Sequence, residues 1–135
     1  MVRMNNKTIK QTIVFKASPH DVYEVLIDSK KHSKFTGSPA KISREVGGKF
    51  SIFDGWTVGE NLELVQDKKI VQTWCVKDDE WPKGHDSIVT FALKKANEGT
   101  ELKFTHEKVP DDWVDSLTKG WEEYYWKPMK KMLDR

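Results

Sequence analysis

The first apolar segment of the chain alternates between apolar and polar positions. Ile9, Ile13 and Phe15 share one phase, and Gln11 lies between them in that same phase. A period of two is typical of a β-strand. Residues 7–17 are therefore predicted to form a strand with one better-buried face.

Two short helices are predicted after this strand. Ser18 is a capping residue for the first helix, Pro19 suits its first position, and Asp21 places a carboxylate near the positive end of its dipole. Asp28 is a cap for the second helix, which Gly37 ends.

From the second helix to residue 107, the period of two continues and is interrupted by residues that favour turns. The interruptions are Gly47-Gly48, Asp54-Gly55, Asp67-Lys68-Lys69, Trp81-Pro82-Lys83-Gly84 and Asn97-Glu98-Gly99. They divide the segment into five or six predicted strands. Side chains that share one phase in three of these strands are Ile70, Trp74 and Val76, then Val89, Phe91 and Leu93, then Leu102, Phe104 and His106. We expect them on one face of an antiparallel sheet, because alternate residues of a strand face the same side.

The last segment has the period of an amphipathic helix, from about residue 112 to about residue 133. Its predicted buried stripe consists of Val114, Leu117, Trp121, Tyr124, Tyr125, Pro128, Met129 and Met132, with Trp126 at the border. Pro128 has no N–H to donate and predicts a bend. The predicted fold class is α+β: a curved antiparallel sheet of about six or seven strands, two short helices, and a long C-terminal helix packed on the concave face.

Composition and charge narrow the classes of function. The chain has 135 residues, which predicts a single domain over residues 1–135. Its 23 Lys and Arg and 21 Asp and Glu are scattered along the chain, which argues against nucleic acid as the main partner. The single cysteine, Cys75, excludes an intrachain disulfide and a cysteine-based zinc cluster. No apolar run has the length of a membrane span or the features of a signal peptide, so a cytoplasmic location is predicted.

Aromatic side chains dominate the predicted site, since the chain has six Trp, six Phe and three Tyr. The residues predicted to contact a ligand between the long helix and the sheet are Trp74, Phe91, Phe104, His106, Trp121, Tyr124 and Tyr125. Ligand pockets are apolar with a few convergent polar groups, and Gln72 would supply a further one. The alternative is an ordinary core, in which the same rings fill the space completely.

No residue pattern predicts a catalytic group, a metal site or a cofactor. The four histidines lie too far apart in sequence for a ligand pair, and Glu60 and Glu63 have opposite phase and should face opposite sides of the sheet. His106 either serves a ligand or a proton transfer, or is a hydrogen-bonded histidine near a strand end. Trp81 lies in a polar loop, where it either anchors a partner or folds back over the sheet edge; we favour the second reading.

Four segments, in their order and spacing, resemble a known family. They are GGKFSIFDGWTVGENLELVQDKKIVQTW, WPKGHDSIVTFAL, GTELKFTH with the Val-Pro that follows, and GWEEYYWKPMKKM. Together with the predicted element order, they resemble the helix-grip fold of the START/SRPBCC superfamily. Within it they are similar to the C-terminal domain of the family named for activator of heat-shock-protein-90 ATPase. The resemblance covers nearly the whole chain.

The resemblance implies three functions. The superfamily's shared cavity implies a stand-alone module that binds a small apolar or amphipathic ligand, without covalent chemistry. The family name implies, as the alternative, a chaperone-associated interaction domain that acts through its surface. A second alternative is a cyclase-type enzyme in which His106 or a cavity tyrosine moves protons. In the eukaryotic co-chaperone a preceding domain, with a motif rich in asparagine and tryptophan, makes the principal chaperone contact, and no such motif occurs in this sequence.

Overall fold

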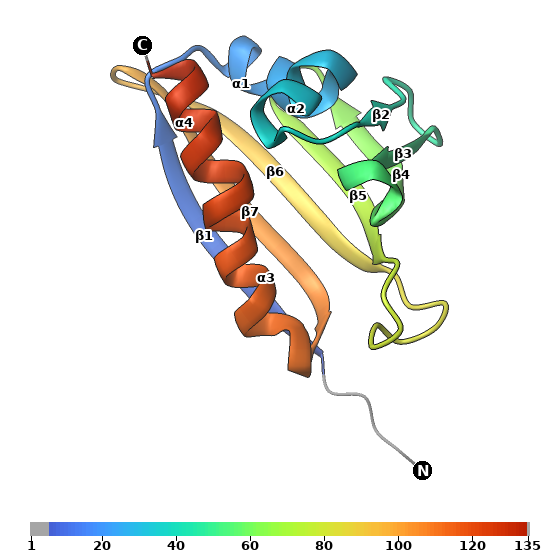
Figure 1. The fold of residues 1–135 in the computed structure, drawn as a ribbon. Coiled ribbons are helices and arrows are strands. Elements are labelled where there is room, and N and C mark those ends of the chain that lie inside the picture. The colour runs from blue at the N-terminus through green and yellow to red at the C-terminus, as the bar shows by residue number, and fades with distance from the viewer. Residues whose placement is uncertain (1–5, 135) are drawn as a thin grey trace.

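A computed structural model describes residues 6–134 of the chain (Figure 1). Its strands are β1 (Asn6–Phe15), β2 (Lys41–Ile42), β3 (Lys49–Ile52), β4 (Thr57–Val65), β5 (Lys69–Val76), β6 (Ser87–Ala96) and β7 (Gly99–Pro110). Its helical elements are α1 (Pro19–Ile27), α2 (Ser29–Thr36), η1 (Phe53–Gly55), η2 (Asp111–Trp113), α3 (Val114–Trp121), η3 (Glu122–Trp126) and α4 (Lys127–Leu133).

The seven strands form one antiparallel sheet in the order β1-β7-β6-β5-β4-β3-β2. From β2 to β7, each strand pairs with the next one in the chain, and all five connections contain the predicted turn residues. The first strand instead pairs with the last, so that Gln11 lies opposite Phe104. The predicted α+β fold with a sheet of about seven strands is confirmed.

The two short helices begin and end at the residues that the sequence indicates. The hydroxyl of Ser18 accepts a hydrogen bond from the backbone N–H of Asp21, at 3.1 Å. A carboxylate oxygen of Asp28 accepts one from the N–H of Lys31, at 2.9 Å. Gly37 ends α2 with a φ of 72°, a conformation that glycine adopts without a steric penalty. These contacts satisfy N–H groups that the first helical turns leave without a partner.

The long C-terminal helical segment lies lengthwise over one face of the sheet, and α1 and α2 cover the same face at one end (Figure 1). The buried apolar side chains of the sheet meet those of the helices in this layer. No helix formed by residues 6–134 lies on the other face of the sheet. This is the helix-grip arrangement that the sequence predicts.

The C-terminal segment differs from the single α-helix that the sequence predicts. The backbone N–H of Lys127 donates to the carbonyl of Glu122, so η3 is a π-helical turn between α3 and α4. Pro128 gives the reason: its ring would clash with the carbonyl of the residue four positions earlier, and it has no N–H to offer that carbonyl. The wider turn removes this conflict, as π-bulges inside α-helices do.

A β-bulge in β4 corrects a second prediction. The register between β4 and β5 shifts between Asn61 and Glu63, so the strict alternation on which the prediction rested is broken there. As a result, both Glu60 and Glu63 are exposed, although their sequence phase placed them on opposite sides of the sheet.

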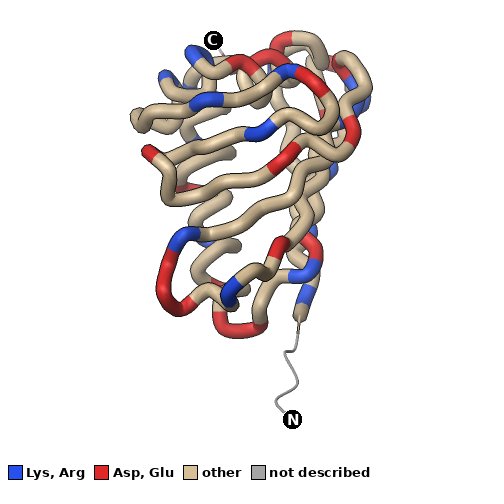
Figure 2. The backbone as a smooth tube through the Cα atoms, turned by 90° about the vertical axis from the view of Figure 1, so that its right-hand side faces the viewer, with Lys and Arg blue, Asp and Glu red and all other residues tan. Residues whose placement is uncertain are grey.

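Charged residues of both signs are interspersed over the molecule rather than gathered on one element (Figure 2).

Candidate functional site

Six of the seven residues predicted to contact a ligand lie together between helix and sheet. They are Trp74 on β5, Phe91 on β6, Phe104 and His106 on β7, Trp121 on α3 and Tyr125 on η3, and all are buried. Trp121 is at the centre, because its ring lies 4.3 Å from that of Phe104, 4.5 Å from that of Tyr125 and 4.7 Å from that of Trp74, between centroids. These rings form one continuous cluster, which we call the inner aromatic cluster.

Tyr124, the seventh residue, points away from this cluster, and 60% of it is exposed. The prediction placed it on the buried stripe by counting 100° per residue. A π-helical turn advances each side chain by a smaller angle, because its hydrogen bonds span five residues rather than four. The turn over Glu122–Trp126 therefore rotates Tyr124 outward and Trp126 inward.

Trp126, which the sequence placed at the border of the stripe, is fully part of the inner aromatic cluster. Its ring lies 5.1 Å from that of Phe104 and stacks on that of Trp121, with 20° between the ring planes. Its indole N–H donates to the side-chain carbonyl of Gln11 on β1, at 2.7 Å. Pro128, two residues later, is the signal in the sequence for the buried position of Trp126. It indicates a π-helical turn rather than a bend.

His106 is buried inside a complete chain of hydrogen bonds. The indole Nε1–H of Trp121 donates to Nδ1 of His106, at 3.1 Å. Because Nδ1 accepts, the proton of the neutral ring is on Nε2, which lies 2.7 Å from the hydroxyl of Ser87. That hydroxyl donates to the carbonyl of Trp74, at 2.7 Å. Burial lowers the pKa of His106 to about 3. The ring is therefore neutral at pH 7 and uses both of its nitrogens.

A second buried histidine, His32 on α2, has no such complete set of partners. Its Nε2 lies 2.8 Å from the hydroxyl of Tyr125, whereas its Nδ1 is buried without a hydrogen-bond partner among the described residues. Burial lowers the pKa of His32 to about 4 and raises the pKa of Tyr125 well above its usual range. No spacing in the sequence indicates this pair, since its members are 93 residues apart. Its only local signal is Phe35, three positions on and on the same helix face.

Gln72 is buried on the inner face, as predicted, but its partner was not foreseen. Its side-chain N–H donates to the carbonyl of the Asn61 side chain, at 2.9 Å. Asn61 in turn donates to the backbone carbonyls of Ser43 and Glu45, at 2.7 and 3.0 Å. This buried network fastens the loop between β2 and β3 to the sheet, so Gln72 has a structural role at this site.

Trp81 folds back, as the favoured reading predicts. It is buried against Trp113, with 5.5 Å between ring centroids, and its indole N–H donates to the carbonyl of His85, at 2.8 Å. The loop between β5 and β6 therefore closes one end of the molecule rather than presenting this indole to a partner.

Two spaces adjoin the inner aromatic cluster, and both are small. An inner void of about 10 Å³ lies among His32, Gln72, Trp74 and Tyr125, and it is just large enough for one water molecule. A surface groove of about 100 Å³ is bounded by residues of η1 and the residue after it, of β5 and of the C-terminal helical segment. They are Phe53, Trp56, Trp74, Ser116, Leu117, Gly120, Trp121, Tyr124 and Tyr125. The indole N–H of Trp74, which borders both spaces, is buried without a partner among residues 6–134. The aromatic rings thus leave little room inside the fold.

Two further properties bear on function. No three or more His, Cys, Asp or Glu side chains of residues 6–134 gather as a metal-binding group. Within the same range, no helix combines the length and the apolar character that crossing a bilayer requires.

Comparison with known proteins gives a consistent result. A family described as "Activator of Hsp90 ATPase homolog 1-like protein" matches residues 16–134. The human activator of 90 kDa heat shock protein ATPase homolog 1 is 34% identical over 124 residues, which cover 92% of this chain and 36% of the human protein. The corresponding homolog of Dictyostelium discoideum is 35% identical over 130 residues, covering 96% and 32%. The chain thus spans about a third of the length of these relatives.

Solved structures show the same fold. The crystal structure of a protein described as an HSP90 activator from Plasmodium falciparum has a TM-score of 0.82 and 26% identity, and the match covers 96% of both chains.

Proposed function

The chain belongs to the family of activator of Hsp90 ATPase homolog 1-like proteins, and we propose that it is a chaperone-associated interaction domain that binds Hsp90 and changes its ATPase rate. The observation that carries this proposal is 34% identity, over 92% of the chain, to a protein named for that activity. The chain spans only about a third of that relative. We therefore propose the activity for the one START/SRPBCC-like domain that residues 1–135 form.

The filled interior supports an action through the surface. Ligand pockets usually enclose about 300 to 1,000 Å³, whereas the inner void next to Trp74 has a volume of about 10 Å³. A partner of protein size has to be met by exposed side chains instead.

Exposed aromatics along the surface groove are the best candidates for that contact. Tyr124 is 60% exposed and Trp56 is 39% exposed, and Phe53 lies between them with its ring 6.2 and 6.5 Å from theirs. Tyrosine and tryptophan are enriched among the residues that dominate binding energy at protein interfaces. Phe53 has a φ of 52°, which is uncommon for a residue other than glycine. Such a conformation persists only where the surroundings hold it, so the turn presents these rings in a fixed arrangement.

The test is the ATPase rate of purified Hsp90, measured with increasing concentrations of the protein. We expect stimulation by the wild type, and for Tyr124→Ala and Trp56→Ala a half-saturating concentration raised about fivefold or more, in line with the loss of an interface aromatic. Val46→Ala is the matched control, because Val46 is an exposed apolar residue in the loop between β2 and β3. A wild-type protein that neither binds Hsp90 nor alters its rate would end the proposal.

A second candidate function is the binding of a small apolar ligand that carries one hydrogen-bond acceptor. The observation in its favour is the surface groove, which is bordered by Trp74, an indole whose N–H has no partner among the described residues. Gly120 lies in this groove and leaves space beside Tyr124. Its replacement by leucine should abolish a thermal shift produced by such a compound, while Val46→Ala should preserve it. A thermal shift that is equal in Gly120→Leu and wild type would place the compound elsewhere.

A further inference from the structure

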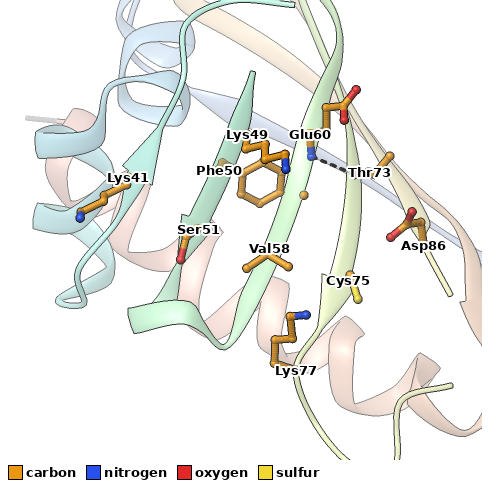
Figure 3. Close-up of a pocket in the computed structure, with 11 residues that line it drawn as sticks. Lys41, Lys49, Phe50, Ser51, Val58, Glu60, Thr73, Cys75, Lys77 and Asp86 are labelled. Atoms are coloured by element: carbon orange, nitrogen blue, oxygen red, sulfur yellow. Dashed lines mark hydrogen bonds between the residues drawn. The ribbon is translucent and has the colours of Figure 1, made fainter. Parts of the chain in front are cut away.

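The uncovered face of the sheet holds a hollow of about 560 Å³ over β3, β4 and β5 (Figure 3). Its half-buried floor is formed by Ser51, Val58, Thr73 and Cys75. Val58 lies between Ser51 and Cys75 in the register of the three strands. Neighbouring strands are about 4.8 Å apart, so the floor is about 10 Å wide. That width accommodates one extended segment of chain and is too small for a folded domain.

Three lysines stand around this floor. Lys41 is on β2, Lys49 is on β3 and Lys77 directly follows β5, and all three are exposed. Within residues 6–134, none of them forms an ion pair with a carboxylate. Lysines elsewhere do form such pairs, for example Lys69 with Glu63 and Lys127 with Glu123. The ammonium groups at the hollow are therefore available to an incoming anion.

Two carboxylates also stand on the rim of the hollow. Glu60 is on β4 and Asp86 precedes β6. Glu60 lies opposite Lys49 in the register of β3 and β4, and its carboxylate points away from the floor (Figure 3). The rim of the hollow therefore carries three lysines and two carboxylates, around a floor in which Val58 and Cys75 are the apolar side chains.

The hollow comes near the surface groove where β4 begins and β5 ends. The backbone N–H of Lys77 donates to the carbonyl of Trp56, at 2.7 Å. Trp56 itself borders the groove. A partner that covers Trp56 therefore reaches the lysine at the near end of the hollow.

We propose that this hollow docks an extended segment of the partner chaperone that combines apolar side chains with acidic ones. The apolar side chains contact Val58 and Cys75, and the carboxylates contact Lys49 and Lys77. The inference rests on the proposed function, since it assigns a second contact surface to the same Hsp90 partner. It differs from that function in the surface concerned, which lies on the face of the sheet opposite to the helices.

The lone cysteine provides a direct measurement. Cys75 lies in the floor and is the only cysteine of the chain, so the mass of an alkylated protein reports on this position alone. We expect a saturating concentration of Hsp90, in the presence of a non-hydrolysable ATP analogue, to slow the alkylation of wild-type Cys75 by iodoacetamide about fivefold or more. An unrelated protein of similar size, added in place of Hsp90, should leave the rate of Cys75 alkylation unchanged.

A pair of charge variants tests the lysines. Lys49→Gln with Lys77→Gln removes two positive charges at the hollow. Lys94→Gln with Lys95→Gln removes the same charge from two exposed lysines near the other end of β6. The first pair should raise the concentration of protein that half-saturates the Hsp90 ATPase response about tenfold, and should weaken its dependence on salt, because fewer ionic contacts are screened. The control pair should behave as the wild type.

The outcomes separate the two proposals. If the wild type stimulates Hsp90 but Cys75 is alkylated at an unchanged rate, the docking site is wrong and the proposed function stands. If the wild type neither binds nor stimulates, both are wrong. If Cys75 becomes protected without Hsp90, as the concentration of the protein itself rises, the hollow is occupied by a second copy of this chain and the chaperone segment is excluded.

Discussion

The two buried histidines occupy two regions of the same inner layer and differ in how their ring nitrogens are used. His106 receives a hydrogen bond from Trp121 and contacts Ser87, so both nitrogens have partners. His32 contacts only Tyr125 and leaves Nδ1 buried without a partner among the described residues. Both rings are neutral at pH 7, because burial lowers both pKa values.

This difference separates two contributions of a buried polar group to stability. A complete set of hydrogen bonds replaces those lost with water, whereas a nitrogen without a partner keeps the full cost of its desolvation. The region around His106 should therefore lose stability when a member of its chain is removed. The region around His32 should tolerate replacement by apolar groups of similar shape. Three experiments examine this contrast, from the largest expected effect to the smallest.

Acid should destabilise the fold through both histidines. An unfolded histidine binds a proton below a pKa of about 6.5, whereas the folded rings do so only near pKa values of about 4 for His32 and about 3 for His106. The unfolded state therefore binds more protons in this range, and stability falls as the pH falls below 6.5. Between pH 7.5 and 5 we expect a loss of about 2 kcal/mol for each histidine and about 4 kcal/mol in total. Urea denaturation followed by tryptophan fluorescence at several pH values measures it.

The exposed histidine His20 acts in the opposite direction, because the hydrogen bond and charge of Asp67 raise its pKa. A His20→Ala variant removes this contribution and isolates that of the two buried rings. A free energy of unfolding that stays constant from pH 7.5 to 5 in this variant would contradict burial of neutral histidines.

Removal of the His106 ring should have the next largest effect. His106→Ala leaves the Nε1–H of Trp121 buried without an acceptor and opens a cavity beside it, and each of these effects is unfavourable. We expect a loss of about 3 kcal/mol at pH 7.5, measured by urea denaturation. A loss below about 1 kcal/mol would mean that water or a neighbouring group replaces the ring, and the contrast between the two histidines would disappear.

Replacement of the pair at the other region should have the smallest effect. His32→Phe together with Tyr125→Phe removes the hydrogen bond and the unpartnered Nδ1 at the same time, so no new buried polar group is left alone. We expect the free energy of unfolding at pH 7.5 to change by less than about 1 kcal/mol. The double variant should also lose about half of the acid sensitivity, since only one buried histidine remains.

The single variant His32→Phe is the control for that experiment. It leaves the Tyr125 hydroxyl buried without a partner among the described residues and should be the less stable protein. Equal stability of the single and double variants would show that the hydroxyl finds another partner.

Local features of the fold could be predicted from the sequence, and features set by a change of register could not. Ser18, Asp28 and Gly37 act within one helical turn of their own position, so the ends of α1 and α2 follow from them directly. The inward phase of Trp74 and Phe104 also survives, because no bulge lies between these residues and the turns that set their strands.

The errors arise where one extra residue enters a regular element. The π-helical turn moves Tyr124 out and Trp126 in, and the bulge after Asn61 exposes both Glu60 and Glu63. Counting residues at a fixed angle fails beyond such a point. The hydrogen-bond partners of the buried side chains are a separate difficulty. The partner of Tyr125 is His32, and no spacing in the sequence indicates contacts between residues so far apart.

The pairing of the first strand with the last has a consequence for synthesis on the ribosome. Gln11 on β1 requires Phe104 as its neighbour in the sheet and Trp126, 115 residues later, as the partner of its side chain. Strands β2 to β7 can pair in the order in which they emerge, whereas β1 has to wait for β7, and the Gln11 side chain has to wait for Trp126. Contacts so distant in sequence slow folding, and unpaired edges invite association with other chains. The nascent first strand therefore stays unpaired until β7 has been synthesised, and its backbone N–H and C=O groups are exposed to other chains during that interval.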